Sequence, residues 1–228
     1  MAMSTSSSQT TAQAIRKTTP SQTTVPVPRN LLVWLTVGVG GTFLFLVIYL
    51  IEGATRPGFS AWQDTISSLS FGPYGWVQQA NFMLCGVSCL LLAVVWRQVL
   101  KGGVCATWYP IMRAVEGVGL IGLGIFRVDP LHTASMVVTI VAMVGGLFVI
   151  ARRFWGDPNW RGWATFSIAC GVWPNLVMPL FGVALNPHSV LAGYTGLIER
   201  LATSPDIVWG VVLLIPLWAG TKLVQKRA

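Results

Sequence analysis

The spacing of its few charged residues constrains this chain more than any other feature, because six long apolar stretches lie between them. Of the 228 residues only 15 are Lys or Arg and 7 are Asp or Glu, and the sign of the charge alternates from one gap to the next. Lys and Arg near the ends of membrane spans stay on the cytoplasmic side. The pattern therefore predicts a polytopic membrane protein with six transmembrane helices.

The two kinds of charge occupy different gaps between the apolar stretches. Most basic residues lie at the two ends of the chain and in the second and fourth gaps: Arg16, Lys17, Arg29, Arg97, Lys101, Arg152, Arg153, Arg161, Lys222, Lys226 and Arg227. Most acids lie in or beside the first, third and fifth gaps: Glu52, Asp64, Asp129, Glu199 and Asp206. We therefore expect both termini on the cytoplasmic side of the plasma membrane.

The composition supports the membrane class and argues against a nucleic-acid partner. The chain is 54% hydrophobic and only 10% charged, which is unusual for a soluble domain. Its net charge of +8 comes from residues at span ends, so we interpret it as a topology signal that also contacts anionic lipid headgroups. The four cysteines lie in or beside apolar stretches, where no His or acid completes a metal-binding set.

The apolar pattern predicts one all-α bundle between two polar tails. Residues 1–30 are rich in Ser, Thr and Gln and are expected to be disordered. Residues 31–222 form the predicted six-helix domain, and residues 223–228 a basic tail. The first stretch, about 21 residues long, exceeds a signal-peptide core and is expected to stay as a helix. The spans are predicted at about 31–51, 76–96, 110–126, 130–150, 163–185 and 205–220.

Prolines suggest where three of the helices begin. Asp129-Pro130 and Ser204-Pro205-Asp206 combine a capping residue with proline, a common start of a helix. Pro110 is expected in the first turn of the third span. Residues 196–203 are then either a separate short helix at the outer surface or a kinked extension of the sixth span.

Two spans carry features with both a structural and a functional interpretation. Four glycines between residues 117 and 124 favour close packing of the third helix against a neighbour. Arg113 and Glu116 are three residues apart and can pair on one face of that helix. We favour a structural ion pair, although an intramembrane acid such as Glu116 is also a functional candidate. Pro174 and Pro179 should interrupt the hydrogen-bond ladder of the fifth helix, which favours a simple kink over a broken helix that exposes carbonyls to a substrate.

The gap after the first span contains the strongest candidate for chemistry. Ser60 and Gln63 form an S-x-x-Q capping box, which predicts a short interfacial helix on the outer surface. Its apolar stripe would consist of Phe59, Trp62, Ile66 and Leu69. Asp64, Ser67 and Ser68 fall largely off this stripe. They are either a solvated polar face or part of a site.

The same region carries a family resemblance. Asp64-Thr-Ile-Ser-Ser-Leu-Ser-Phe-Gly-Pro-Tyr-Gly-Trp-Val-Gln-Gln-Ala-Asn-Phe82, followed by Gly86, resembles a family of bacterial six-helix membrane proteins, domain of unknown function 998. The resemblance covers about residues 30–222 and implies the fold and a location in the bacterial inner membrane. It includes Gly122-x-x-x-Phe126 with Asp129-Pro130, His132-x-x-Ser135, Ala151-Arg-Arg-Phe154 and Gly196-Leu197-x-x-Arg200.

This chain departs from the family pattern at two positions. Many relatives carry histidine at the position of Asp64 and an acid at the position of Thr133. A catalytic or metal site shared by the family would therefore be rearranged or lost here. Because an acid can accept a hydrogen bond from an imidazole, we expect Asp64 to lie beside His132 at the outer end of the bundle.

Polar residues from three separate gaps are expected to converge at the outer helix ends. Such a cluster could bind a lipid headgroup, perform acid–base chemistry, or hold a divalent metal, with Asp64, Asp129 and His132 as candidate ligands. Each residue also has a simpler role as a cap, a turn residue or an interfacial pair. The candidate site consists of Arg56, Asp64, Ser67, Asp129, His132, Glu199 and Arg200, with Glu52 and His188 nearby.

Three functions fit these features. The favoured hypothesis is a non-enzymatic, lipid-handling or accessory protein whose partners are membrane lipids and which needs no cofactor. The second is a membrane-embedded hydrolase or lipid-modifying enzyme. A zinc enzyme usually needs three protein ligands, and no G-x-S-x-G motif supports a serine nucleophile. The third is a small-solute or proton-coupled transporter, suggested by Glu116 and by the prolines of the fifth span.

Overall fold

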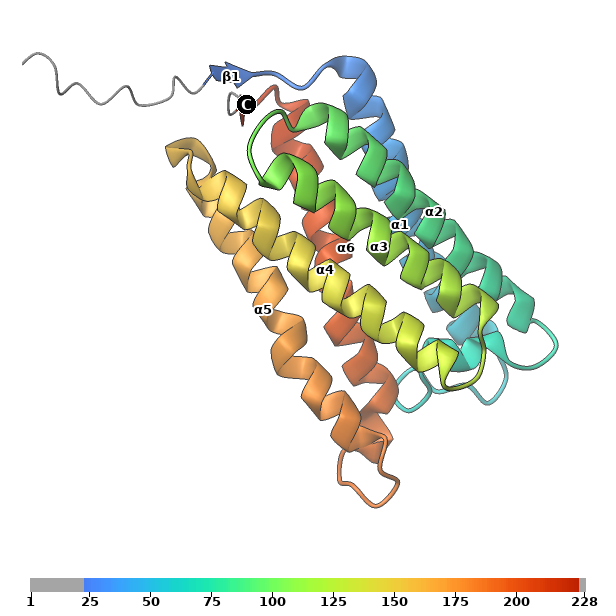
Figure 1. The fold of residues 1–228 in the computed structure, drawn as a ribbon. Helices are drawn as coiled ribbons and strands as arrows, with labels where there is room; N and C mark the ends of the chain where they lie inside the picture. Colours follow the sequence, from blue (N-terminus) through green and yellow to red (C-terminus); the bar gives the residue numbers. More distant parts are fainter. Residues whose placement is uncertain (1–22, 226–228) are drawn as a thin grey trace, which may run out of the picture.

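The computed structural model describes residues 23–225, and six long helices dominate this part of the chain (Figure 1). They are α1 (Arg29–Thr55), α2 (Gly75–Val99), α3 (Cys105–Ile125), α4 (Leu131–Trp155), α5 (Arg161–Ala184) and α6 (Thr195–Trp218). Three short 3-10 helices lie between them, η1 (Ser67–Ser70), η2 (Pro158–Trp160) and η3 (Ala192–Tyr194). The predicted all-α fold is confirmed.

The helices form one closed bundle. Each helix packs against the next one in the chain, and α6 also packs against α1. The loops after α2 and α4 lie at the same end of the bundle as both ends of the described chain, which we name the basic end (Figure 1). The loops after α1, α3 and α5 lie at the opposite end, which we name the cluster end.

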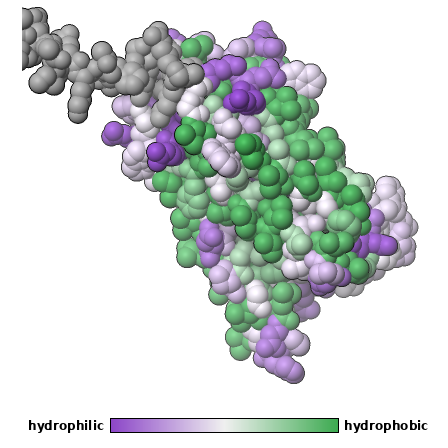
Figure 2. All heavy atoms as spheres, viewed as in Figure 1, coloured by the Kyte–Doolittle hydropathy of each residue, from purple (hydrophilic) through white to green (hydrophobic). Residues whose placement is uncertain are grey.

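Five segments are long and apolar enough to cross a membrane: α1, α2, α4, Pro158–Ala184 and Ala192–Trp218. Apolar side chains also cover much of the surface between the two polar ends (Figure 2). Val141, for example, is 64% exposed, and Ile51, Val118, Leu176 and Ile215 are similarly exposed. A soluble protein rarely exposes so large an apolar surface. The chain is a multi-pass membrane protein.

Helix α3 differs from these five segments because it carries Arg113 and Glu116, although it is 21 residues long. It lies between α2 and α4 and packs against both. Gly86 of α2 and Gly117 of α3 allow the backbones to approach closely, since a Cβ on either would lie 2.6 Å from the carbonyl oxygen of the other. On the α4 side, Gly122 leaves room for Ser135. The glycines of α3 therefore serve helix packing.

Part of the N-terminal tail that was predicted to be disordered, residues 1–30, has regular structure. Residues 1–22 and 226–228 lie outside the described residues, but Thr23–Val25 forms strand β1, which pairs antiparallel with strand β2 (Leu223–Gln225). Helix α1 then begins at Arg29. The indole of Trp160 also donates a hydrogen bond to the carbonyl of Lys222, at 2.9 Å. Partners from the far end of the chain order these residues, which local composition cannot reveal.

Two prolines that were expected to start helices lie inside them instead. Proline removes the N–H that would bond the carbonyl four residues earlier. Arg97 donates to the carbonyl of Ala106, at 2.8 Å, where Pro110 leaves it free. In the same way, the Trp173 indole donates to the carbonyl of Leu201, at 2.8 Å, four residues before Pro205. These bonds allow α3 to begin at Cys105 and α6 at Thr195, so residues 196–203 simply continue the sixth helix.

Three further local expectations were wrong. The segment after α1 forms turns, with helical structure only at η1, because α6 takes up backbone groups that a helix would use: Arg200 bonds to the carbonyls of Ala61 and Asp64, and Glu199 to the Ile66 N–H. Asp129 does not cap α4, whose N-cap position is Pro130; its carboxylate accepts the hydroxyl of Thr133 instead. Helix α5 continues through Pro174 and Pro179, so the alternative of a broken fifth helix is wrong.

Candidate functional site

Residues 57–72, named here the 57–72 segment, cross the cluster end of the bundle and are fastened to α6. The guanidinium of Arg200 donates to the carbonyls of Ala61 and Asp64, both at 2.9 Å. Farther along the segment, the carboxylate of Glu199 accepts the Ile66 N–H at 2.5 Å. Two charged residues that are adjacent in α6 therefore hold backbone groups on both sides of the turn at residue 64.

The packing between the 57–72 segment and α6 is close at Gly196. A Cβ at this position would collide with the carbonyl oxygen of Asp64, so only glycine fits. The Arg200 side chain lies over two aromatic rings, 5.6 Å from the centre of Tyr49 and 5.7 Å from that of Phe59. Cation–π contacts of this kind stabilise a guanidinium that is partly removed from water. The Gly196-Leu197-x-x-Arg200 motif thus serves to seat the segment.

His132 joins the same segment to α4. Its Nε2 lies 3.1 Å from the hydroxyl oxygen of Ser67, and its Nδ1 lies 2.7 Å from the carbonyl oxygen of Phe126. A carbonyl oxygen can only accept, so Nδ1 carries the proton in the neutral ring. Nε2 is then an acceptor directed at the Ser67 hydroxyl. This pairing was not predicted from the sequence, where 65 positions separate the two residues.

The expected contact between Asp64 and His132 is replaced by separate contacts. Asp64 bonds back to the Ser60 N–H, and Ser67 occupies the position beside His132. Arg56 pairs with Glu52 at 2.9 Å and donates to the carbonyl of Phe71 at 3.0 Å. Asp129 contacts Thr133. The candidate residues therefore lie at one end of the bundle but do not form a single cluster.

The candidate metal ligands are also apart. Among residues 23–225, no three His, Cys, Asp or Glu side chains are grouped closely enough to hold a metal ion. Asp64, Asp129 and His132 each take part in a different local contact.

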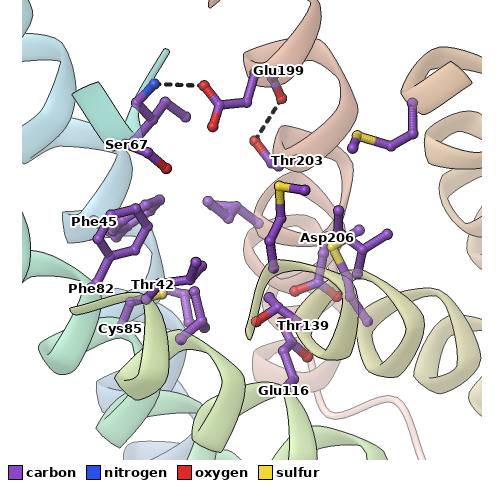
Figure 3. Close-up of a pocket in the computed structure, with 18 residues that line it drawn as sticks. Thr42, Phe45, Ser67, Phe82, Cys85, Glu116, Thr139, Glu199, Thr203 and Asp206 are labelled. Carbon is purple, nitrogen blue, oxygen red and sulfur yellow. Dashed lines mark hydrogen bonds between the residues drawn. The ribbon is translucent and has the colours of Figure 1, made fainter. Parts of the chain in front are cut away.

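A cavity of about 80 Å³ lies beneath the 57–72 segment, inside the bundle (Figure 3). It has room for several water molecules or for part of a slender apolar chain. Ser67 and Glu199 lie at one end, and Glu116 and Asp206 at the other. The remaining lining is mostly apolar: Thr42, Phe45, Ile66, Phe82, Cys85, Leu120, Leu123, Met136, Thr139, Ile140, Met143, Met178, Thr203 and Ile207.

One face of α6 supplies a polar stripe to the cavity. Glu199, Thr203 and Asp206 are spaced i, i+4 and i+7, so they lie on one side of the helix. The Thr203 hydroxyl donates to the carbonyl of Glu199 at 3.0 Å. Sequence reasoning missed this stripe because Asp206 was interpreted as a helix-start residue. The 199–203–206 spacing was the signal that could have revealed it.

The deep end of the cavity adjoins a buried charge cluster. Arg113 Nη1 lies 2.8 Å from both carboxylate oxygens of Asp206 and 3.0 Å from Glu116 Oε2. All three side chains are at most 7% exposed, and Cys89 Sγ lies 3.5 Å from Arg113 Nη2. The Arg113–Glu116–Asp206 cluster therefore combines two carboxylates with one guanidinium. It contains the expected ion pair and a third member from α6.

Comparison with known proteins identifies a family. The family model described as Protein of unknown function (DUF998) matches residues 39–216, which include the 57–72 segment, the cavity and the buried charge cluster. The resemblance noted from the sequence is thereby confirmed. No curated protein and no solved structure matches the chain.

Proposed function

We propose that this chain, which belongs to the family described as Protein of unknown function (DUF998), handles lipids of the bacterial plasma membrane by holding an apolar chain in its cavity. The observation that carries the proposal is the composition of the cavity wall. Apolar side chains line most of it. Ser67 and Glu199 lie at the end beneath the 57–72 segment, while Glu116 and Asp206 at the deep end are paired with Arg113. An amphiphile could place its chain along the apolar wall and its polar part beneath the 57–72 segment.

The nature of the apolar side chains also supports a flexible ligand. Met136, Met143 and Met178 all line the cavity. Methionine is unbranched and polarizable, so it adapts to chains of different shape. A rigid, highly polar ligand would require more hydrogen-bonding groups than this wall offers.

The topology that completes the proposal has six spans. Helix α3 would be the sixth, because its charged side chains pair inside the bundle rather than facing lipid. The basic end carries Arg97, Lys101, Arg152 and Arg161, which favours a cytoplasmic location for that end and for both termini. The cluster end would then lie outside. The polar end of the cavity would consequently lie at the depth of the outer leaflet.

The charged residues of the cluster end have a supporting role in this proposal. Arg200 and Glu199 bond to the backbone of the 57–72 segment, and Arg56 pairs with Glu52. Their polar atoms are thus used to fix the cover of the cavity. A bound lipid would be selected mainly by its chain, with Ser67 as the nearest hydroxyl at the cavity end.

A matched pair of substitutions on α4 tests lipid binding. Ile140 lines the cavity, whereas the next residue, Val141, is 64% exposed on the bundle surface. The full chain would be placed in phosphatidylethanolamine–phosphatidylglycerol nanodiscs that contain a phospholipid with a photoreactive acyl chain. The indole of Ile140→Trp would fill space that the acyl chain needs, so crosslinking within the cavity should fall by roughly tenfold, which corresponds to about 1.4 kcal/mol of binding free energy.

The control is Val141→Trp, which adds the same ring outside the cavity and should leave crosslinking within it unchanged. The crosslinked peptides, identified by mass spectrometry, should include those containing Leu120 and Met143. Equal crosslinking in the wild type and in Ile140→Trp would show that lipid does not enter the cavity. Crosslinks confined to the outer surface would lead to the same conclusion.

A second candidate function, proton-coupled transport, is favoured by the Arg113–Glu116–Asp206 cluster. Intramembrane carboxylates often mark ion pathways, and here two of them share one guanidinium. The prolines of the fifth span no longer support transport, because α5 is a continuous helix. Glu116→Gln should abolish proton flux into proteoliposomes under an imposed pH gradient, whereas Glu52→Gln at the helix end should not. Equal flux in wild-type and Glu116→Gln liposomes would remove this candidate.

A further inference from the structure

We infer that Ser67 and His132 form a nucleophile–base pair that cleaves the acyl ester of a lipid whose chain occupies the cavity. The inference rests on the proposed lipid binding and adds a reaction to it. The sequence alone favoured a non-enzymatic protein. We infer an enzyme because the fold brings His132 Nε2 beside the Ser67 hydroxyl, a contact that the sequence does not show.

The geometry of the pair meets the requirements for nucleophilic catalysis. The Ser67 hydroxyl oxygen lies 3.1 Å from His132 Nε2, within the range over which an imidazole can remove a hydroxyl proton. A third group orients the base, since Nδ1 lies 2.7 Å from the carbonyl oxygen of Phe126. This carbonyl stands where a carboxylate stands in the Ser-His-Asp triad. It holds the tautomer whose Nε2 is free to accept a proton.

The surroundings of Ser67 fix its position. Leu69, two residues later, is completely buried, and Ile66, immediately before, is 2% exposed and bonded through its N–H to Glu199. The nucleophile is thus held between two anchored apolar residues. Glu199 acts here as a positioning residue, because it touches the backbone of the segment and not the reacting hydroxyl.

The neighbouring serine provides an internal contrast. The hydroxyl of Ser68 donates to the carbonyl of Thr65, at 2.6 Å, and so satisfies a local turn. Ser67 alone of these two is paired with an imidazole and lines the cavity. A simple need for polarity in the 57–72 segment would not distinguish the two side chains. Their different partners point to a specific task for Ser67.

The position of Ser67 also indicates the class of substrate. Beneath it, the cavity is walled by Phe45, Leu120, Leu123 and Met136, which suit an acyl chain. The volume of about 80 Å³ fits only a short segment of an acyl chain and no headgroup. An ester carbonyl at the top of the buried chain would therefore lie near the Ser67 hydroxyl, with the alcohol part directed out of the bundle. The substrate class is a lipid acyl ester.

The reaction balances with water as the only co-reactant. Ser67 Oγ attacks the ester carbonyl carbon while its proton passes to His132 Nε2. The bond from that carbon to the alcohol oxygen then breaks, and His132 returns the proton to the departing alcohol. Water next attacks the acyl–serine ester and gives one proton to His132. The carbon–Oγ bond breaks, Ser67 recovers the proton, and the free fatty acid leaves.

A fluorophosphonate probe tests the nucleophile on the full chain in detergent micelles. The wild type should be labelled at Ser67, and it should hydrolyse p-nitrophenyl octanoate. Ser67→Ala should lose both properties. The matched variant Ser68→Ala should retain both, because its hydroxyl only closes a turn. Absence of labelling in the wild type, or equal labelling in Ser67→Ala, would overturn the inference.

His132→Gln separates catalysis from a structural hydrogen bond. A glutamine amide can donate toward Phe126 and accept from Ser67, but it cannot take up a proton. Loss of a general base typically lowers the rate by about 10²–10⁴-fold, so labelling and hydrolysis should fall by that factor at an unchanged melting temperature. A variant that reacts as fast as the wild type would show that His132 only pins the 57–72 segment.

The outcome is distinguishable from failure of the lipid-binding proposal. Photocrosslinking in Ser67→Ala should be at least as strong as in the wild type, because the variant cannot cleave the acyl ester of the bound lipid. Normal crosslinking without any probe reaction would refute the Ser67–His132 pair and leave lipid binding intact. Labelling of Ser67 without crosslinks in the cavity would instead refute the lipid as the substrate.

Discussion

Removal of Arg113 should destabilise the protein more than removal of any other positive charge in residues 23–225. Arg113 is 4% exposed and faces Glu116 and Asp206, so Arg113→Met would leave two buried carboxylates without a counter-charge. Breaking a buried ion pair by removing one partner typically costs about 3–5 kcal/mol. Since 1 kcal/mol corresponds to about 2–4 °C in a domain of this size, the melting temperature should fall by roughly 6–20 °C.

Intrinsic tryptophan fluorescence of the chain in detergent provides the assay, because 11 tryptophans are present. Arg152→Met is the matched control: Arg152 is exposed on α4, and a surface change of this kind is usually within about 0.5 kcal/mol. The decisive variant combines Arg113→Met with Glu116→Met and Asp206→Val. Replacing all members of a buried ionic group by apolar residues of similar volume is often nearly neutral, so this variant should regain most of the loss.

Two results would refute this reasoning. One is an Arg113→Met protein that melts within about 2 °C of the wild type, since that would mean less than 1 kcal/mol of stabilisation from the cluster. The other is a combined variant no more stable than Arg113→Met. That result would assign the stabilisation to the packing of the Arg113 side chain and not to its charge.

The remaining predictions concern topology and helix packing. A cysteine at Val190, which is 92% exposed at the cluster end, should react with a membrane-impermeant maleimide from outside intact cells, while one at Gly156 should react only after permeabilisation. The four native cysteines are buried and should stay silent; the opposite labelling pattern would reverse the orientation. Gly117→Ala should lower the melting temperature, because its Cβ would lie 2.6 Å from the Gly86 carbonyl oxygen, whereas Gly182→Ala has open space and should be neutral or stabilising. Equal effects of the two changes would contradict the close α2–α3 packing.

Much of the fold could be predicted because each membrane-spanning helix corresponds to a long, continuous apolar stretch of the sequence. The expected second span, about 76–96, lies within Gly75–Val99, and the expected first span lies within Arg29–Thr55. The errors occurred where a side chain from another helix completes the backbone hydrogen bonding. Nothing near Pro110 or Pro205 in the sequence shows that Arg97 or Trp173 supplies the missing donor.

The candidate site was predictable as a location but not as a set of contacts. The distribution of charges predicted one common end of the bundle for Ser67, His132, Glu199 and Arg200. In the structure they lie at that end. Which side chain meets which depends on the path of the 57–72 segment. Because this segment forms turns and not the expected helix, Ser67 and not Asp64 faces His132.

In the structure, the two departures from the family pattern lie outside the Ser67–His132 pair. Asp64 and Thr133 were expected to disturb any shared site, yet each is engaged in a local contact, with the Ser60 N–H and with Asp129 respectively. Neither replaces a partner of the Ser67–His132 pair, whose third member is a backbone carbonyl that no substitution at Phe126 can delete. An orienting group of this kind is independent of side-chain identity. The chemistry inferred for Ser67 therefore depends on how α3 ends and α4 begins, since that turn sets the distance between the Phe126 carbonyl and the His132 ring.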